Sequence, residues 1–207
     1  MTSLEIVNLE SDLAPELARI ELACFPTTNP DDLLSEEDIR AYAEVFPEGY
    51  FVAMADGRPV GMGAGIYVDF DFNNPQHTLA EISGENQCGN HSPDGEWYYG
   101  TDISVHPDFR GRGIGKMLYQ SRKALVISDD KRGIIAGGSL PGFVGHKASM
   151  TVDKYVDRVV AGELSDPTLS FQLANGFEVR SLLEEYVEDD SEDGWATLIV
   201  WENVSLL

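Results

Sequence analysis

The chain has 207 residues, 43% of them apolar and 24% charged, and its formal net charge is −22. This length and apolar content predict a folded chain with a sizeable core, arranged as one domain over 1–207. A polyanion repels a phosphate backbone, and no apolar run reaches the roughly 20 residues of a membrane-spanning helix. We therefore expect no nucleic-acid and no membrane partner.

The N-terminal segment lacks a basic stretch followed by an apolar core, which predicts a cytoplasmic protein. Cys24 and Cys88 are the only cysteines and have no paired spacing, so a disulfide framework is not expected.

Hydrophobic periodicity and turn residues divide the chain into strands and helices. Ser35 followed by Asp38 is a capping-box pattern, and Asp56-Gly57 suits a tight turn between strands. Strands that alternate with helices and end in a hairpin predict a mixed α/β sheet. In chain order, the expected elements are a strand at 3–9, helices at 12–24 and 35–46, a hairpin at 49–68, a strand at 97–105, a helix at 113–127, a strand at 133–140, helices at 151–162 and 166–177, and strands at 177–187 and 195–202.

The stretch "HPDFRGRGIGKMLYQSRK" lies between a predicted strand and a predicted helix. Backbone N–H groups at such a junction have no partner in the helix and favour anions. Gly111, Gly113 and Gly115 remove side chains that would keep a phosphate away from those amides.

Positive charge is concentrated in the same region. Seven of the fourteen basic residues fall within 110–132, where only Asp129 and Asp130 oppose them, which leaves an excess of five positive charges. This excess predicts an anionic ligand such as a phosphate ester. The seven residues are Arg110, Arg112, Lys116, Arg122, Lys123, Lys131 and Arg132.

Two well-known phosphate motifs do not fit this stretch. The nucleotide-triphosphate loop needs a glycine at position 110 and Ser or Thr after the lysine, whereas this chain has Arg110 and Met117. The dinucleotide fingerprint needs a third glycine where Lys116 stands. A nucleotide-binding switch is therefore disfavoured.

The pattern that remains, Arg110-x-x-Gly113-x-Gly115 between a strand and a helix, resembles the motif of the GNAT (Gcn5-related N-acetyltransferase) superfamily. "FQLANGF" resembles that family's second landmark, a helix that closes on Gly-Phe before a strand. The order of elements also matches, except for two long insertions at 69–96 and 138–165. More narrowly, "GGSLPGF" and "GELSDPTLSFQLANGF" resemble the acetyltransferase-like domains fused to carbon–nitrogen hydrolases.

The resemblance implies the GNAT acyl-CoA N-acyltransferase fold, with acetyl-CoA as the donor, a small amine as the acceptor, no metal, and a homodimer as a compatible assembly. The pyrophosphate would bind the amides of the glycine stretch. The pantetheine arm would pair with the strand edge, where an amide would also stabilise the oxyanion formed by direct attack of the amine. The expected cofactor-binding residues are Ile103, Ser104, Val105, Arg110, Gly111, Arg112, Gly113, Ile114, Gly115 and Lys116.

The catalytic positions depart from the family's pattern. Its general acid is often a tyrosine four residues before the Gly of Gly-Phe, which is Gln172 here, and its occasional glutamate base falls near Tyr99. The catalytic candidates are Tyr99, whose phenol can transfer a proton, and Asp102, an acid within an apolar strand. The alternatives are a core aromatic for Tyr99 and an edge carboxylate for Asp102. The missing tyrosine keeps open a second interpretation, a GNAT-like module that binds CoA or a partner protein without catalysis.

Three other patterns predict loops or packing. Cys88, His91 and Asp94 have metal-like spacing but lack a second ligand pair, so we expect a polar loop. The acidic run at 184–193 is expected to be a solvated loop, with attraction of a cationic amine as the alternative. Cys24 is expected to be a buried thiol. We expect the two insertions to cover the acceptor side of the sheet and to set specificity.

Overall fold

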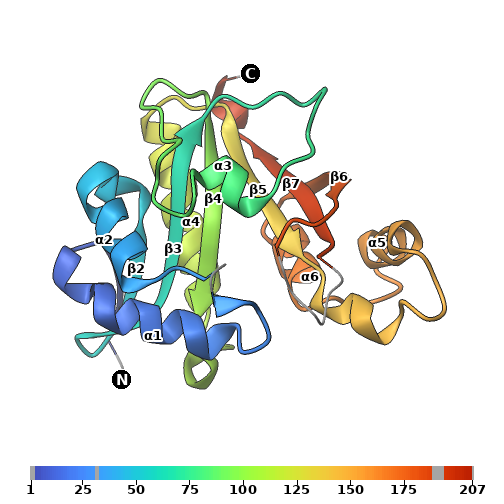
Figure 1. The fold of residues 1–207 in the computed structure, drawn as a ribbon, viewed down its shortest axis with the longest axis horizontal. Helices are drawn as coiled ribbons and strands as arrows, with labels where there is room; N and C mark the ends of the chain where they lie inside the picture. Colours follow the sequence, from blue (N-terminus) through green and yellow to red (C-terminus); the bar gives the residue numbers. More distant parts are fainter. Residues whose placement is uncertain (1–2, 31–32, 188–193, 207) are drawn as a thin grey trace.

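The computed structural model describes residues 3–30, 33–187 and 194–206 (Figure 1). The described strands form one seven-stranded sheet in the order β1-β2-β3-β4-β5-β7-β6. Only the β4–β5 pair is parallel, so the sheet is mixed, as the alternation of strands and helices predicts. The strands are β1 (Leu4–Asn8), β2 (Phe51–Ala55), β3 (Arg58–Val68), β4 (Trp97–Val105), β5 (Gly133–Ser139), β6 (Glu178–Leu183) and β7 (Ala196–Glu202).

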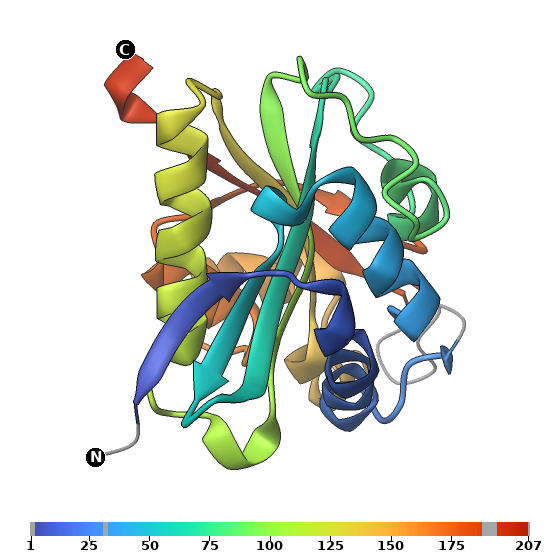
Figure 2. The same cartoon turned by 90° about the vertical axis from the view of Figure 1, so that its left-hand side faces the viewer.

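Helices cover both faces of the sheet. Figure 2 shows α4 on one face and the pair α1 and α2 on the other. No helix in the described ranges is both long and apolar enough to cross a membrane. The α-helices are α1 (Ala14–Cys24), α2 (Glu36–Val45), α3 (Leu79–Ser83), α4 (Ile114–Ser128), α5 (Val152–Val160) and α6 (Leu169–Ala174).

The segment at 69–96 contains a helix that periodicity did not indicate. Thr78 and Glu81 form a capping box at the start of α3, in which each side chain accepts a hydrogen bond from the other residue's backbone N–H. Gly84 ends the helix in a left-handed conformation. The Thr-x-x-Glu pattern was present in the sequence, but five helical residues are too few to show a 3.6-residue period.

β4 and β5 are paired over only part of their length. The parallel ladder joins Trp97–Gly100 of β4 to Gly133–Ala136 of β5. Beyond it β4 runs on to Val105 and β5 to Ser139 without pairing to each other, and the two strands diverge (Figure 1). The second half of β4 therefore presents backbone N–H and C=O groups along an edge inside the sheet.

A β-bulge in the β3–β4 pair is filled by Arg122 of α4. Ala64 pairs with Asp102 and Gly65 with Gly100, so Thr101 is the extra residue. The Arg122 Nη2 donates to the Ala64 carbonyl oxygen at 2.7 Å and also to the Asp102 carbonyl oxygen.

Two glycines make room for this guanidinium. A Cβ on Gly63 would lie 3.1 Å from the Arg122 Nη2, and one on Gly100 would lie 3.1 Å from its Nη1. Arg122 is 1% exposed. The positive charge of Arg122 is therefore buried within the sheet and does not contribute to a cluster on the surface.

Candidate active site

Two joined pockets form one cleft where β4 and β5 diverge. The outer pocket, of about 690 Å³, is lined by the glycine turn and the start of α4. The inner pocket, of about 150 Å³, lies deeper between the two strands. Ile103, Tyr119 and Gln172 line both pockets, so the cleft is continuous from the glycine turn to the interior of the sheet.

The three glycines of the turn serve two different purposes. Gly111 and Gly113 have φ angles of +75° and +83°, and a Cβ on either would meet nothing within 4 Å. These positions need glycine for the left-handed backbone rather than for space. A Cβ on Gly115 would lie 2.8 Å from the Phe171 Cζ, so this glycine allows α4 and α6 to pack.

The turn and the N-terminus of α4 line the outer pocket. Gly113 is the N-cap of α4 and makes no side-chain capping hydrogen bond. The first N–H groups of this 15-residue helix therefore have no partner within it and favour an anion.

Of the ten residues predicted to bind the cofactor, Arg112 and Lys116 do not line the outer pocket. Arg112 donates to the Asp108 carbonyl oxygen at 3.1 Å and lies over the Phe109 ring. The eight that line it are Ile103, Ser104, Val105, Arg110, Gly111, Gly113, Ile114 and Gly115.

The predicted concentration of positive charge at the turn is wrong. Lys123 donates to the Asn175 carbonyl oxygen, Lys131 donates to the Pro93 carbonyl oxygen, and Arg132 pairs with Glu96 at 3.0 Å. Lys123 lies in the second half of α4, Lys131 and Arg132 lie beyond its C-terminal end, and Arg122 is buried in the sheet. Closeness in sequence overstated the local charge, because a 15-residue helix carries its ends about 22 Å apart.

Two carboxyl groups share one hydroxyl at the inner pocket. The Ser104 Oγ lies 2.9 Å from the Glu21 Oε2 and 2.8 Å from the Asp102 Oδ1, although one hydroxyl proton can be donated to only one of them. Burial raises the pKa of Asp102 to about 6, against the lowering effects of Ser104 and Arg122. Burial, and then the charge of Asp102, raise the pKa of Glu21 well above its usual value. Near neutral pH we therefore expect the pair to hold one proton in common.

Three polar atoms around the inner pocket lack hydrogen-bond partners among the described residues. They are the Asp102 Oδ2, the Arg122 Nε and the Gln172 Oε1, and all three residues line this pocket. Buried polar atoms in folded proteins are nearly always paired. These three atoms give the inner pocket a polar lining that suits a polar ligand.

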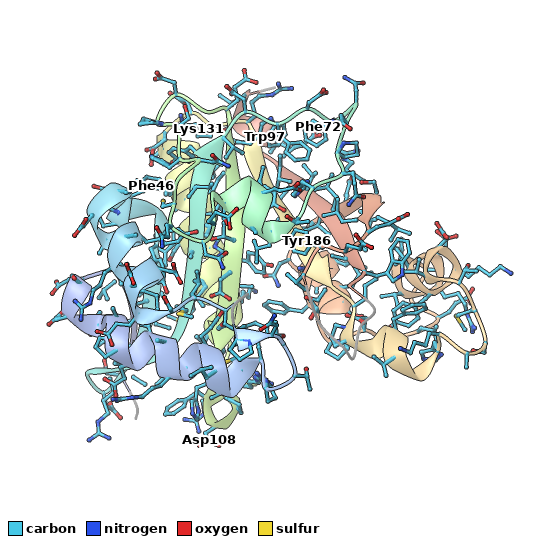
Figure 3. The ribbon with its side chains drawn as sticks, in the orientation of Figure 1. Phe46, Phe72, Trp97, Asp108, Lys131 and Tyr186 are labelled. Carbon is cyan, nitrogen blue, oxygen red and sulfur yellow. The ribbon has the colours of Figure 1, made fainter. Side chains whose placement is uncertain are left out.

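Tyr99 lies behind the cleft rather than in it. It is fully buried and lines neither pocket, so the structure does not place it against a substrate. Its hydroxyl oxygen is 2.6 Å from the His77 Nε2 and 3.1 Å from the hydroxyl oxygen of Tyr186. Tyr186 does line the inner pocket, and Figure 3 shows it near the middle of the molecule beside α3.

Sequence reasoning missed Tyr186 because it stands within an acidic run, but a signal for it existed in β5. A Cβ on Gly137 would lie 2.2 Å from the Tyr186 Cζ, and one on Gly138 would lie 2.4 Å from the Gln172 Oε1. Consecutive glycines inside a strand mark a close approach of other groups. Here they admit the two side chains that form this wall of the inner pocket.

The remaining candidates have packing roles. The His91 Nδ1 accepts the Tyr67 N–H at 3.2 Å, and its ring stacks on Phe46 with centroids 4.2 Å apart. Within the described ranges, no three His, Cys, Asp or Glu side chains are grouped to hold a metal ion. Cys24 is half-buried and lines the outer pocket, which corrects the expected buried thiol, and burial raises its pKa. Of the acidic run, 188–193 lie outside the described residues.

Sequence comparison assigns this mixed sheet, which opens beside a glycine turn at a helix N-terminus, to a known family. The chain belongs to the acetyltransferase (GNAT) family, whose model matches residues 14–132. GNAT proteins use acyl-CoA.

Two relatives come from Bacillus subtilis (strain 168). The chain is 32% identical over 203 residues to the uncharacterized N-acetyltransferase YkwB, covering 98% of this chain and 90% of that one. It is 34% identical over 203 residues to the probable hydrolase YhcX, covering 98% of this chain but 39% of YhcX. The chain thus spans about two fifths of that relative, which confirms the resemblance to domains joined to hydrolases.

Among solved structures, the GphF GNAT-like decarboxylase in complex with isobutyryl-CoA superposes with a TM-score of 0.78. The match is 18% identical and covers 96% of this chain and 98% of that one, which establishes a common fold.

Proposed function

We propose that this protein transfers an acetyl group from acetyl-CoA to the amine of a small molecule by direct attack. The observation that carries the proposal is the continuous cleft, which joins an anion-binding turn to a pocket containing two carboxyl groups. The pyrophosphate binds the amides from Gly111 to Gly115. The pantetheine arm lies along the unpaired half of β4, and the thioester lies at Ile103, where the two pockets join.

The carboxyl pair suits an amine that arrives protonated. The Asp102 Oδ2 has no partner, so it can accept a hydrogen bond and then a proton from the ammonium group. With a pKa of about 6, Asp102 is charged at neutral pH and still basic enough to take that proton. The neutral amine then attacks the thioester carbonyl, and a backbone amide of β4 stabilises the oxyanion.

The two segments predicted to set specificity both reach the cleft. Leu79 of α3, within 69–96, lines the inner pocket, and Pro141, within 138–165, lines the outer pocket. These contacts support a role for the first segment in acceptor choice. Most of the second segment, including α5, lies outside the cleft lining.

A second candidate function is loss of CO₂ from a 2-carboxyacyl-CoA. Two observations favour it: the fold shared with a GNAT-like decarboxylase, and Arg122, whose unpartnered Nε at the inner pocket could hold a carboxylate. The reaction consumes one proton and yields the shortened acyl-CoA with CO₂. A non-catalytic CoA-binding module is the third candidate, supported by Gln172 in place of the family's tyrosine.

One set of measurements separates the three functions. Calorimetry with acetyl-CoA tests binding, release of free CoA thiol over a panel of amines tests transfer, and mass spectrometry after incubation with malonyl-CoA tests decarboxylation. We expect binding, together with thiol release that depends on the amine and is lost in Asp102→Asn. Binding without release or decarboxylation supports the module, acetyl-CoA formed from malonyl-CoA supports the decarboxylase, and no binding overturns all three.

A further inference from the structure

We propose that Tyr186, Tyr99 and His77 form a relay that removes a proton from the attacking nitrogen and returns it to the sulfur of CoA. The relay rests on the proposed N-acyltransferase function and supplies its missing acid–base step. It also explains how catalysis proceeds without a tyrosine at Gln172.

The three side chains make an unbroken line from the inner pocket to the 69–96 segment. Tyr186 lines the pocket, its hydroxyl oxygen is 3.1 Å from that of Tyr99, and the Tyr99 oxygen is 2.6 Å from the His77 Nε2. The His77 Nδ1 lies 2.6 Å from the carbonyl oxygen of Pro75. Both tyrosines are buried and His77 is half-buried, so one end of the line opens to the cleft and the other lies nearer the solvent.

The Pro75 carbonyl links the direction of the hydrogen bonds in the line to the protonation state of His77. A carbonyl oxygen can only accept, so the His77 Nδ1 must carry a proton and, in neutral His77, Nε2 must accept. With His77 in this neutral form, Tyr99 donates to His77 and Tyr186 donates to Tyr99, which is the reverse of the direction in the structure, where the Tyr99 hydroxyl donates to the Tyr186 oxygen. In that arrangement the Tyr186 oxygen, which also receives a hydrogen bond from the Gly137 backbone N–H, can accept a proton from the inner pocket.

Protonating His77 reverses the line. Both ring nitrogens then donate, so Tyr99 receives a hydrogen bond from His77 and donates to Tyr186. The Tyr186 hydroxyl now points its proton toward the pocket. The two protonation states of His77 therefore correspond to the acceptor and donor forms of one side chain at the reacting centre.

The surroundings of the His77 ring favour its neutral state. Burial lowers the pKa of His77, against the raising effects of the Pro75 carbonyl and the Glu81 carboxylate. Glu81 of α3 is the charged group that acts on the ring, and Tyr99 of β4 and Tyr186 are its other titratable neighbours. Burial also raises the pKa of both phenols, that of Tyr186 to about 12, so neither is expected to persist as a phenolate. The proton must pass through both hydroxyls in one concerted movement.

The proton balance closes without another reactant. After the amine attacks, one carbon carries both the new C–N bond and the old C–S bond. The relay takes one proton from the nitrogen and stores it on His77. When the C–S bond breaks, its electron pair stays on sulfur, and the relay returns the proton through Tyr186 to give CoA thiol and the amide. The first ammonium proton, taken by Asp102, leaves to solvent.

The kinetic test compares Tyr99→Phe with Tyr98→Phe. Tyr98 is the neighbouring, fully buried tyrosine of β4, and its hydroxyl donates to the Gly49 carbonyl oxygen at 2.7 Å, away from the cleft. We expect Tyr99→Phe to lower kcat about 100-fold, within the range for general acid–base catalysis, with little change in KM for acetyl-CoA. Tyr98→Phe should retain most of kcat, and both variants should unfold at similar temperatures.

Solvent isotope effects distinguish a relay from a structural role. With a slowly reacting amine, kcat in mixtures of H₂O and D₂O should follow a curved dependence on deuterium content, because several protons move together. Tyr99→Phe breaks the chain, so its dependence should become linear. Equal kcat values for the two variants, or an unchanged curve in Tyr99→Phe, would overturn the relay while leaving N-acyl transfer intact.

A further measurement, which does not depend on activity, tests the direction of the hydrogen bonds between His77 and the two tyrosines. Nitrogen NMR of His77 in the free protein should show the Nδ1-protonated neutral tautomer, with a pKa below the usual 6.5. His77→Gln identifies the signal. An Nε2-protonated neutral ring would overturn the relay whatever the amine assay shows. If no amine is acetylated but the Nδ1 tautomer is found, the proposed function fails and the side-chain geometry stands.

Discussion

The glycine turn and the inner pocket lie at opposite ends of one cleft and are built from different kinds of group. The turn offers the backbone of one short segment, and its side chains are minimal at Gly111 and Gly113. The inner pocket binds through side chains from separate elements: Glu21 on α1, Asp102 on β4 and Gln172 on α6. Under the proposed function, the turn holds the acyl-CoA donor and the inner pocket decides which reaction follows.

This difference also separates the consequences of substitution. A change at Gly111 or Gly113 should act mainly on donor affinity, because a side chain there meets no other group of the protein. A change at the inner pocket should act on both chemistry and stability, because its polar groups are buried among core residues.

The largest effect is expected from Gly113→Asp. The substitution adds a negative charge where the pyrophosphate binds and strains a residue at φ +83°. Calorimetry should show about a 1,000-fold loss of acetyl-CoA affinity, or about 4 kcal/mol. Gly162→Asp is the control, since Gly162 has φ +75°, open space and no contact with the cleft. If both variants lose affinity equally, strain rather than charge explains the loss.

Arg122→Met should have the next largest effect, on stability. It leaves the buried carbonyl oxygens of Ala64 and Asp102 without their donor, which should cost about 3 kcal/mol in the free energy of unfolding. Arg132→Met is the control, because Arg132 makes an exposed ion pair with Glu96 and should cost less than about 1 kcal/mol. Denaturant titration measures both. Similar losses would mean that the bulge does not depend on the buried guanidinium.

Asp102→Asn should lower kcat/KM for the amine about 100-fold while sparing acetyl-CoA binding. The wild-type rate should fall as the pH drops through about 6, because the carboxylate is the active form. The folded pKa lies above the ordinary 3.8, so the folded state holds this proton more tightly than the unfolded state does. Stability should therefore decline as pH rises from about 4 to about 6, and stay lower above that range.

Asp102→Asn should make the decline of stability with rising pH smaller and raise the unfolding temperature at neutral pH. Thermal unfolding between pH 4 and 7 measures it, and Glu21→Gln should do the same because the two groups share a proton. A wild-type unfolding temperature that rises over this pH range would contradict the raised pKa.

Gly115→Ala should have the smallest effect. The new Cβ would lie 2.8 Å from the Phe171 Cζ, and the ring can shift because it is 36% exposed. We expect a loss of about 1 kcal/mol in stability and a change in acetyl-CoA affinity far below that of Gly113→Asp. Phe171→Leu in the same chain should restore the stability. If Phe171→Leu does not restore the stability, position 115 requires glycine for its backbone conformation rather than for the packing of α4 against α6.

Local patterns predicted the elements well where the pattern itself is the cause. Ser35 and Asp38 form the expected capping box of α2, and β2 and β3 turn at Asp56-Gly57. The family followed from the glycine turn and the helix before Gly176, because both are conformational requirements of a few adjacent residues. Charge did not follow in this way: adjacency along α4 suggested a cluster that the helix disperses over its length.

What this chain encodes locally is its alternation of strands and helices and the turn that receives the donor, since φ angles and helix ends depend on neighbouring residues. Tertiary structure alone brought Glu21 beside Asp102 and placed Tyr186 over Gly137. It also showed that Tyr99, a candidate for contact with the substrate, instead lies buried between His77 and Tyr186. The physical reason is that a shared proton or a relay depends on distances near 3 Å between elements far apart in sequence, and only packing sets those distances.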